Sequence, residues 1–360
     1  TDASGKAQTV PAGKVHGYQM EIDTNPDNQG NRQWTAGLYE EGRRGWLFPG
    51  LLGGDKAAFT EQGRRLTKLG EWNHVKVEAV GPRIRSWLNG ELRVDVMDGD
   101  SPRGFIGFQV HAVPEKLAGT QVRFRNVVLT EVAPNTLTET EKADGWQLLF
   151  DGASTDAWRS ARGTIFPSKG WVVRDGTFTV LAGDGAESAG GGDIVTKRAF
   201  KAFELSAEFR LTPGANSGIK YFVQPALNAG SGSAFGLEFQ ILDDARHPDA
   251  KLGRDGDRTI GSLYDLIPAR ADKLTRTIGE WNHALIRTSA DGRKVEHWLN
   301  GRLVVAYERG SEAFRAARAR SKYADPKYGA DFGEWPEGHL LLQDHGNEVS
   351  FRSIRVRDVA

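Results

Sequence analysis

The sequence predicts an all-β protein made of two β-sandwich domains. Three observations lead to this prediction: short runs in which apolar and polar residues alternate, two phrases that each occur twice, and Asn-Gly pairs between alternating runs. The phrase GEWNH occurs at Gly70–His74 and Gly279–His283, and WLNG occurs at Trp87–Gly90 and Trp298–Gly301. A separation of about 210 residues is too long for a solenoid repeat and indicates two copies of a whole domain.

The alternating runs are rich in Val, Ile, Phe and Trp and are bounded by Gly, Asn or Asp, as β-strands are. They include Phe203–Leu211, His74–Val80, Lys294–Glu308 and Val349–Val359. Because an Asn-Gly pair accommodates the positive φ angles of a type I′ turn, Asn89 and Asn300 predict tight hairpins. Many short antiparallel strands in about 200 residues favour a two-sheet sandwich over a small barrel.

Two further local predictions concern aromatic and helical segments. Trp72 and Trp281, in the two GEWNH phrases, are expected to be core aromatics where strands begin. Ser311–Ala324 has a helical composition with an apolar and basic face. We expect a short helix there, with a solvated loop as the alternative.

The repeat divides the chain into an incomplete domain at residues 1–132, a linker at residues 133–143 and a complete domain at residues 144–360. The second copy begins with a long stretch, from Asp144 through Leu211 and NSGIKYF (Asn216–Phe222), that has no counterpart in the first copy. The first domain is therefore expected to lack its N-terminal strands and to leave strand edges uncovered. A missing N-terminal piece, the second domain or a partner chain could complete its sheet.

Composition limits the partners and the chemistry. Lys+Arg and Asp+Glu both number 47, so the formal charge is zero and no nucleic-acid partner is predicted. No apolar run approaches the roughly 18 residues that a membrane span needs. The chain has no Cys, which excludes disulfides, thiolate metal sites and a thiol nucleophile. We expect a bacterial periplasmic or secreted protein whose signal peptide is not in this chain.

One predicted strand of the second domain carries carboxylate and amide groups. In FGLEFQILDD, Glu238 and Gln240 share one face because residues i and i+2 of a strand point to the same side. Asp243 joins them only if a bulge intervenes. Such groups do not suit a core face, so we expect a solvated concave face that binds sugars. A polar face without function is the alternative.

A second polar cluster lies near the C-terminus. The stretch LLLQDHGNEVSF places Gln343, Asp344 and His345 between two apolar runs. An Asp beside a His suits a general acid or base, or a metal site. His297, in VEHWLNG, is expected either to reach the same face or to be a hydrogen-bonded surface residue.

The first domain repeats this pattern with Val110 in place of Asp344, so its site is chemically different. Its candidate sugar-binding residues combine acidic, aromatic and guanidinium groups, which suit sugar hydroxyls and ring faces. They are Glu21, Asp23, Tyr39, Arg43, Arg44 and Trp46. For the arginines, a salt-bridged loop is the alternative. No phosphate loop, zinc-protease helix or Gly-x-Ser-x-Gly elbow is present.

Several stretches together resemble the 3-keto-disaccharide hydrolase domain family, which has a concanavalin A-like jelly-roll fold. In the second domain they cover nearly all of residues 144–360 and comprise GWQLLFDG, NSGIKYF, GLEFQILDD, GSLYDLIPA, GEWNH, EHWLNG, SKY and HLLLQDHGNEVSFRSIRV. The first domain resembles a sister type through GYQMEID, LYEEGRRGWL, EWNH and FQVH. The resemblance implies two jelly rolls, the second catalytic and the first accessory.

The resemblance also implies cleavage of glycosides that already carry a ketone at C3. Such a ketone acidifies the C2 proton, so a base can remove it and expel the C1 substituent before water adds. His345 with Asp344 is the implied base or metal site, and Glu238 is the implied acid or second ligand. A divalent ion could stabilise the enolate. The implied substrate-binding residues are Gln240, Asp243, Tyr264, Gln343 and His297.

Two other functions stay open at this point. The pattern Glu238-x-Gln240-x-x-Asp243 has the spacing of the Glu-x-Asp-x-x-Glu strand of laminarinase-type retaining glucanases. Here, however, the middle carboxylate is an amide and the last one is a shorter Asp, which weakens that interpretation. The other alternative is a carbohydrate-binding protein without catalysis.

Overall fold

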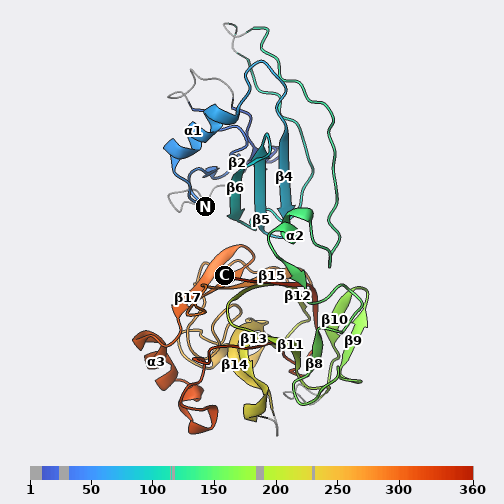
Figure 1. Cartoon of the computed structure of the whole chain (residues 1–360), viewed down its shortest axis with the longest axis vertical. Helices are drawn as coiled ribbons and strands as arrows, with labels where there is room; N and C mark the ends of the chain where they lie inside the picture. Colours follow the sequence, from blue (N-terminus) through green and yellow to red (C-terminus); the bar gives the residue numbers. More distant parts are fainter. Residues whose placement is uncertain are drawn as a thin grey trace. The chain divides into compact units, whose positions relative to one another are not determined.

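The computed structural model describes residues 10–23, 32–113, 115, 118–183, 190–228 and 232–359. The chain separates into two compact units, unit 1 at Thr1–Glu131 and unit 2 at Val132–Ala360. Strands dominate both units and helices are few (Figure 1), so the all-β prediction is confirmed. None of the helices in the described ranges is long and apolar enough to span a membrane.

Unit 2 is a sandwich of two antiparallel sheets (Figure 1). The eight-stranded sheet has the order β17-β16-β15-β12-β19-β10-β9, and β7 also pairs with β19. Its strands are β7 (Gln147–Leu148), β9 (Trp171–Arg174), β10 (Thr177–Val180), β12 (Phe203–Leu211), β15 (Trp281–Thr288), β16 (Lys294–Leu299), β17 (Arg302–Glu308) and β19 (Val349–Asp358).

The five-stranded sheet of unit 2 has the order β14-β13-β18-β11-β8. Its strands are β8 (Trp158–Ser160), β11 (Ile194–Phe200), β13 (Asn216–Gln224), β14 (Phe235–Leu242) and β18 (Gly338–Leu342). The strand β13 thus pairs with β14 on one edge and with β18 on the other.

The core of unit 2 lies between the two sheets. Phe209 of β12 and Phe239 of β14 are fully buried, with ring centroids 6.5 Å apart. Burying each such ring stabilises the fold by about 1.5–3 kcal/mol. Because side chains alternate along a strand, the neighbours Glu238 and Gln240 must point to the outer face of the five-stranded sheet. Both side chains are buried there, 4% and 1% exposed, so the prediction that they lie on a solvated face is wrong.

The helical segments of unit 2 are short. They are α2 (Glu139–Ala143), α3 (Glu312–Ala319) and the 3-10 segments η2 (Pro225–Asn228), η3 (Pro248–Lys251), η4 (Lys322–Ala324) and η5 (Pro326–Tyr328). The helix predicted within Ser311–Ala324 is therefore present as α3. The stretch predicted as a linker belongs to unit 2: Asn135 accepts a hydrogen bond from the Ser353 N–H (2.7 Å), and Arg355 pairs with Glu141.

Unit 1 contains two three-stranded antiparallel sheets, ordered β1-β2-β3 and β4-β5-β6. Its elements are β1 (Gly17–Met20), β2 (Leu38–Glu41), β3 (Gly45–Phe48), α1 (Lys56–Leu66), β4 (Val75–Val80), β5 (Arg83–Leu88) and β6 (Glu91–Met97). The helix α1 was not predicted from the sequence; the Asp55 carboxylate caps its first turn by accepting from the Ala58 N–H (2.7 Å). The stretches of unit 1 that match β18 and β19 form no strand in the part of the chain that the structure describes.

The two repeated phrases are bound to each other by hydrogen bonds. In unit 2, Asn300 of WLNG donates from Nδ2 to Oδ1 of Asn282 in GEWNH (2.8 Å). The Oδ1 atom of Asn300 accepts from the His283 N–H (2.8 Å). Asn300 has a φ of 48°, as predicted for the hairpin turn. The side chain that permits the turn thus also fixes the start of β15.

Unit 1 contains the same arrangement, which we call the Asn clasp in both units. Asn89 donates to Oδ1 of Asn73 (2.9 Å) and accepts from the His74 N–H (2.8 Å). Its φ is 50°. The phrases recur because each needs the other to form this clasp.

The prediction that Trp72 and Trp281 lie in the core is wrong. Trp72 is 46% exposed, and Trp281 is only partly buried. Each ring packs instead under a guanidinium group, that of Arg125 in unit 1 (3.9 Å from Cζ to the ring centroid) and that of Arg352 in unit 2 (4.1 Å). The tryptophans therefore make cation–π contacts outside the buried core.

We predict that Asn300→Ala destabilises unit 2 by about 2–4 kcal/mol, because it leaves buried groups unpaired and forces alanine to a positive φ. Asn300→Gly relieves the backbone strain and should cost less. Urea unfolding followed by tryptophan fluorescence would measure both variants. Equal stability of Asn300→Ala and the wild type would contradict the structural role of the clasp.

Candidate active site

The candidate site lies on the outer face of the five-stranded sheet of unit 2, centred on β13. Gly218 of β13 lies opposite Gln240 of β14. On its other side, the Gly218 carbonyl accepts a hydrogen bond from the Gln343 N–H (3.0 Å). Gln240, Gly218 and Gln343 therefore form one row across three strands. The missing side chain at Gly218 leaves room for the Glu238 carboxylate between the two carboxamide residues.

The Glu238 carboxylate leans over this space. A Cβ atom added to Gly218 would lie 2.2 Å from Glu238 Oε1, so a larger residue would displace the carboxylate. Lys220 Nζ lies 3.6 Å from Glu238 Oε2, and both side chains are buried. The Lys220 ammonium also donates to Ser233 Oγ (2.5 Å). The Glu238 carboxylate and the Lys220 ammonium therefore form a buried ion pair on this face.

Asp344 binds backbone groups. Its Oδ2 accepts from the N–H groups of Gly191 and Gly192 (2.9 Å each), and its Oδ1 accepts from the Gly346 N–H (3.0 Å). The prediction from the sequence paired Asp344 with His345 as a base. With both oxygens engaged by backbone donors, Asp344 instead fixes the loop on either side of the imidazole.

A second histidine, His247, lies next to His345. Their ring centroids are 6.1 Å apart and the ring planes are nearly perpendicular. His345 Nδ1 is buried and has no hydrogen-bond partner among the described residues. His247 Nδ1 accepts from the Asp249 N–H (3.2 Å), so neutral His247 carries its proton on Nε2. Burial, and then the proximity of His345, lowers the pKa of His247.

Tyr264 connects this pair to the Glu238 strand. Its hydroxyl donates to Asp249 Oδ2 (2.9 Å), and its N–H donates to the Glu238 carbonyl (3.0 Å). Burial, followed by the charges of Glu238 and Asp249, raises the pKa of Tyr264 well above its usual value. Tyr264 is therefore a hydrogen-bond donor at neutral pH.

Two residues predicted to bind substrate already have structural partners. Asp243 accepts from the Gly214 N–H (2.8 Å) and from Arg246 (3.1 Å). Burial acts to raise the pKa of Asp243, but these hydrogen bonds lower it overall. His297 lies inside the core, where its ring nitrogens meet the Tyr221 hydroxyl (2.7 Å) and the Gly261 carbonyl (3.1 Å). Burial lowers the pKa of His297 to about 4. Both side chains therefore serve the fold.

The predicted sugar-binding residues of unit 1 are held in side-chain networks. Arg44, for example, forms a bidentate pair with Asp98 (2.7 and 2.9 Å). The loop that contains Arg43 and Arg44 is therefore salt-bridged, which was the alternative to sugar binding. The remaining contacts join Arg43 and Arg44 to Glu40, Asp23 to Arg32, Glu21 to Gln19, and Trp46 to Tyr39.

Within the described ranges, no three His, Cys, Asp or Glu side chains lie close enough together to hold a metal ion. The His247–His345 pair supplies two imidazoles, but Asp344 is bound to backbone N–H groups. This donor set does not fit a divalent metal centre.

Sequence reasoning missed His247, Lys220 and Asp249. His247 belongs to a loop, RHPDA, that shows no strand pattern, and Lys220 sits in NSGIKYF, which looks like a buried strand. The available signal was the alternation in NSGIKYF, which places Gly218 and Lys220 on the face opposite Ile219.

The chain is similar to known proteins that are named as sugar hydrolases. A relative from Bacteroides thetaiotaomicron, a 3-keto-disaccharide hydrolase, is 36% identical over 232 residues, which cover 60% of this chain and 79% of the relative. A crystal structure from Parabacteroides distasonis, presented as a candidate glycosyl hydrolase, is 28% identical with a TM-score of 0.52. That match covers 63% of this chain and all of the other.

The family described as the 3-keto-alpha-glucoside-1,2-lyase-like domain matches residues 4–130 and 145–357. The two matches fall on the two units and confirm the resemblance seen in the sequence. The chain therefore belongs to the 3-keto-alpha-glucoside-1,2-lyase-like domain family.

Proposed function

We propose that unit 2 cleaves glycosides that carry a ketone at C3, by elimination across C1 and C2 followed by addition of water. The observation that carries this proposal is the His247–His345 pair, in which one imidazole has a buried nitrogen without a described partner and the other has a defined donor nitrogen. Family membership and the Bacteroides relative support the substrate class.

In the first step, His345 acts as the base. The C3 ketone acidifies the C2–H bond, so the imidazole takes the proton and the electron pair of that bond moves toward the carbonyl. The negative charge then rests on the C3 oxygen as an enolate. A positioned imidazole suits this transfer because one ring nitrogen can accept the proton and later return it.

His247 stabilises the enolate. Since its Nδ1 is occupied by the Asp249 N–H, its Nε2–H can donate to the C3 oxygen. The lowered pKa of His247 keeps the ring neutral, so it acts as a hydrogen-bond donor and does not compete for the C2 proton. A fixed donor of this kind stabilises charge that develops in the transition state.

In the second step, the enolate expels the C1 substituent. The C3 carbonyl re-forms, a double bond forms between C1 and C2, and the C1–O bond breaks. The His345 imidazolium returns its proton to the leaving oxygen. Water then adds to C1 while a proton returns to C2, so one water is consumed and nothing is oxidised or reduced.

The polar row beside the histidines holds the sugar. Glu238, paired with Lys220, accepts hydrogen bonds from hydroxyl groups of the sugar, while Gln240 and Gln343 lie on either side of Gly218. A retaining glucanase would need two carboxyl groups about 5–5.5 Å apart. Here position 240 is an amide, and Asp243 is engaged by backbone and Arg246.

We predict that His345→Gln lowers kcat on a chromogenic 3-keto-glucoside by about 10²–10⁴-fold. The matched control is His111→Gln, the equivalent change in unit 1, which should leave the rate unchanged. Release of the chromophore would be measured for both variants and for the ordinary glucoside. Activity on the ordinary glucoside would support a glucanase, and binding without release would support a non-catalytic binding protein.

We predict that His247→Ala lowers kcat by about 10²–10³-fold, as the loss of an oxyanion donor does, and that His247→Gln retains more activity. Because the pKa of His247 is lowered, the ring takes up a proton only at a lower pH than an ordinary histidine does. The acidic limb of kcat/KM should therefore persist in His247→Gln. Disappearance of that limb would identify His247 as the base and refute the assignment.

A further inference from the structure

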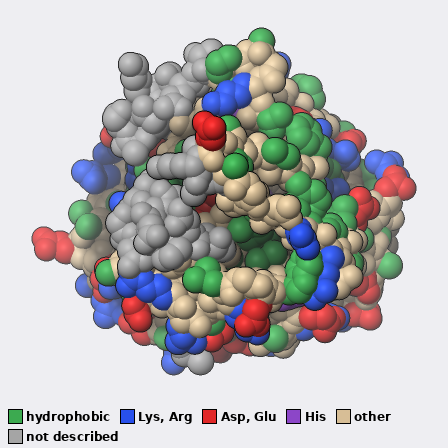
Figure 2. Space-filling model, turned by 90° about the horizontal axis from the view of Figure 1, so that it is seen from above, with side chains coloured by type: hydrophobic (Ala, Val, Ile, Leu, Met, Phe, Trp, Pro, Cys, Tyr) green, Lys and Arg blue, Asp and Glu red, His purple; other side chains and the backbone are tan. Residues whose placement is uncertain are grey.

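Unit 1 exposes two apolar segments, residues 104–110 (GFIGFQV) and residues 122–129 (VRFRNVVL). We call them the apolar segments. In sequence they match β18 and β19, which are central strands of unit 2, yet neither joins a sheet among the described residues of unit 1 (Figure 1). Hydrophobic side chains gather on the face of the molecule seen in Figure 2.

The same positions are buried in unit 2. Ile106 is 73% exposed, whereas its equivalent Leu340 is 0% exposed. Val127 is 64% exposed, whereas its equivalent Ile354 is 0% exposed. The same contrast separates Phe108, Phe124 and Leu129 from Leu342, Phe351 and Val356. Side chains suited to a core are therefore uncovered in unit 1.

The segment at residues 122–129 keeps local features of β19. Asn126 has a φ of 51°, and its equivalent Ser353 has a φ of 52°. Arg125 lies over Trp72 as its equivalent Arg352 lies over Trp281. The segment is thus shaped as a strand and lacks only neighbouring strands in the described part of unit 1.

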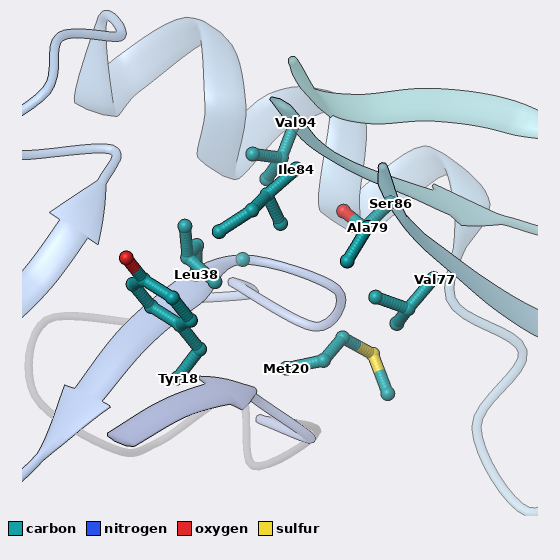
Figure 3. A pocket seen from close by; sticks show the side chains of 9 residues that line it. Tyr18, Met20, Leu38, Val77, Ala79, Ile84, Ser86 and Val94 are labelled. Atoms are coloured by element: carbon teal, nitrogen blue, oxygen red, sulfur yellow. The ribbon is translucent and has the colours of Figure 1, made fainter. Parts of the chain in front are cut away.

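A cavity of about 100 Å³ lies between the two small sheets of unit 1. Figure 3 shows side chains from both sheets pointing into it. Its lining is mostly apolar and includes Tyr18, Met20, Leu38, Val77, Ile84 and Val94. A cavity of this size is well below the roughly 300 Å³ of ordinary ligand pockets. It is better explained as a gap in a sandwich core.

The strand edges beside this gap also lack sheet partners within the described ranges. There, β4 pairs with β5 only, whereas its equivalent β15 pairs with β12 on the second edge. Likewise, β1 pairs with β2 only, whereas its equivalent β14 pairs with β13. Both missing neighbours, β12 and β13, come from the stretch that the first copy lacks.

We propose that unit 1 is completed by a polypeptide segment that supplies strands equivalent to β12 and β13. Each strand would carry one apolar face, as FELSAEFRL and NSGIKYFVQ do. One strand would pair with β4 and 122–129, and the other with β1 and 104–110. Their inward side chains would fill the cavity. Strand addition to an open edge is a general mode of peptide recognition.

A second copy of this chain fits the gap less well. Its own β12 and β13 are already paired on both edges within unit 2. Pairing of β4 with β4 of another copy would cover an edge and leave the cavity and the apolar segments open. The donor must therefore be a segment whose two strands are free to pair, which the β12 and β13 strands of unit 2 are not.

Hydrogen exchange with peptide-level mass spectrometry tests this proposal. The 360-residue chain would be compared with the same chain carrying a copy of its residues 194–228 ahead of Thr1, and with a control carrying a scrambled copy. We expect fast exchange at 104–110, 122–129 and β4 in the chain alone. We expect the native copy, and not the scrambled one, to slow it by about tenfold or more.

Exchange within unit 2 reports whether each of the three proteins is folded and should be the same in all of them. Slow exchange of the apolar segments in the dilute, monomeric chain would overturn the proposal, because no donor would then be needed. If exchange of the apolar segments slows only when the chain dimerises, then a second copy of the chain covers them, which would also overturn the proposal. Equal exchange with the native and scrambled copies would also overturn it.

Discussion

The strand β13 is the element on which both the core and the candidate site of unit 2 depend. It joins β14 to β18, and its alternation sends Ile219 into the core and Gly218 and Lys220 to the outer face. The same nine residues therefore close the sandwich and form the floor of the site. Unit 1, whose described residues include no equivalent of β13, has an open core and an incomplete site.

The chemistry available to the site depends on which of its polar groups already have hydrogen-bond partners within the protein. Asp344 and Asp243 bind backbone N–H groups, so they shape loops. The buried Lys220–Glu238 pair provides fixed charges, and removing one partner of such a pair usually costs more than the pair contributes. His345 keeps a buried nitrogen without a described partner, and His247 keeps its Nε2–H available. In the proposed mechanism, these two rings are the groups that exchange or donate a proton.

Much of the fold could be predicted because strand alternation and Asn-Gly turns are local signals. The hairpins at Asn89 and Asn300, the helix α3 and the outward Glu238 and Gln240 all follow from residues close in sequence. The partners of Asp344 could not be predicted, since Gly191 and Gly192 lie about 150 residues away in the chain. Likewise, Trp72 resembles a core residue until its contact with Arg125 is known.

The two units show that a shared turn chemistry does not imply a shared site. Both have the Asn clasp, yet Gln19 stands in unit 1 where unit 2 has Glu238, and Val110 stands in place of Asp344. In unit 1, Gln19 donates directly to Gln109 (3.2 Å), whereas β13 separates the equivalent residues of unit 2. The clasp fixes the same hairpin geometry in both units, while the site residues differ.

The most direct test of the proposed chemistry is the fate of the C2–H bond during cleavage. Single-turnover rates would be measured for a 3-keto-glucoside with hydrogen and with deuterium at C2, and the product would be examined for retained label. Elimination predicts slower cleavage of the deuterated substrate, because the C2 bond breaks before the C1 substituent leaves. Equal rates with full retention of deuterium at C2 would contradict elimination and indicate direct displacement at C1.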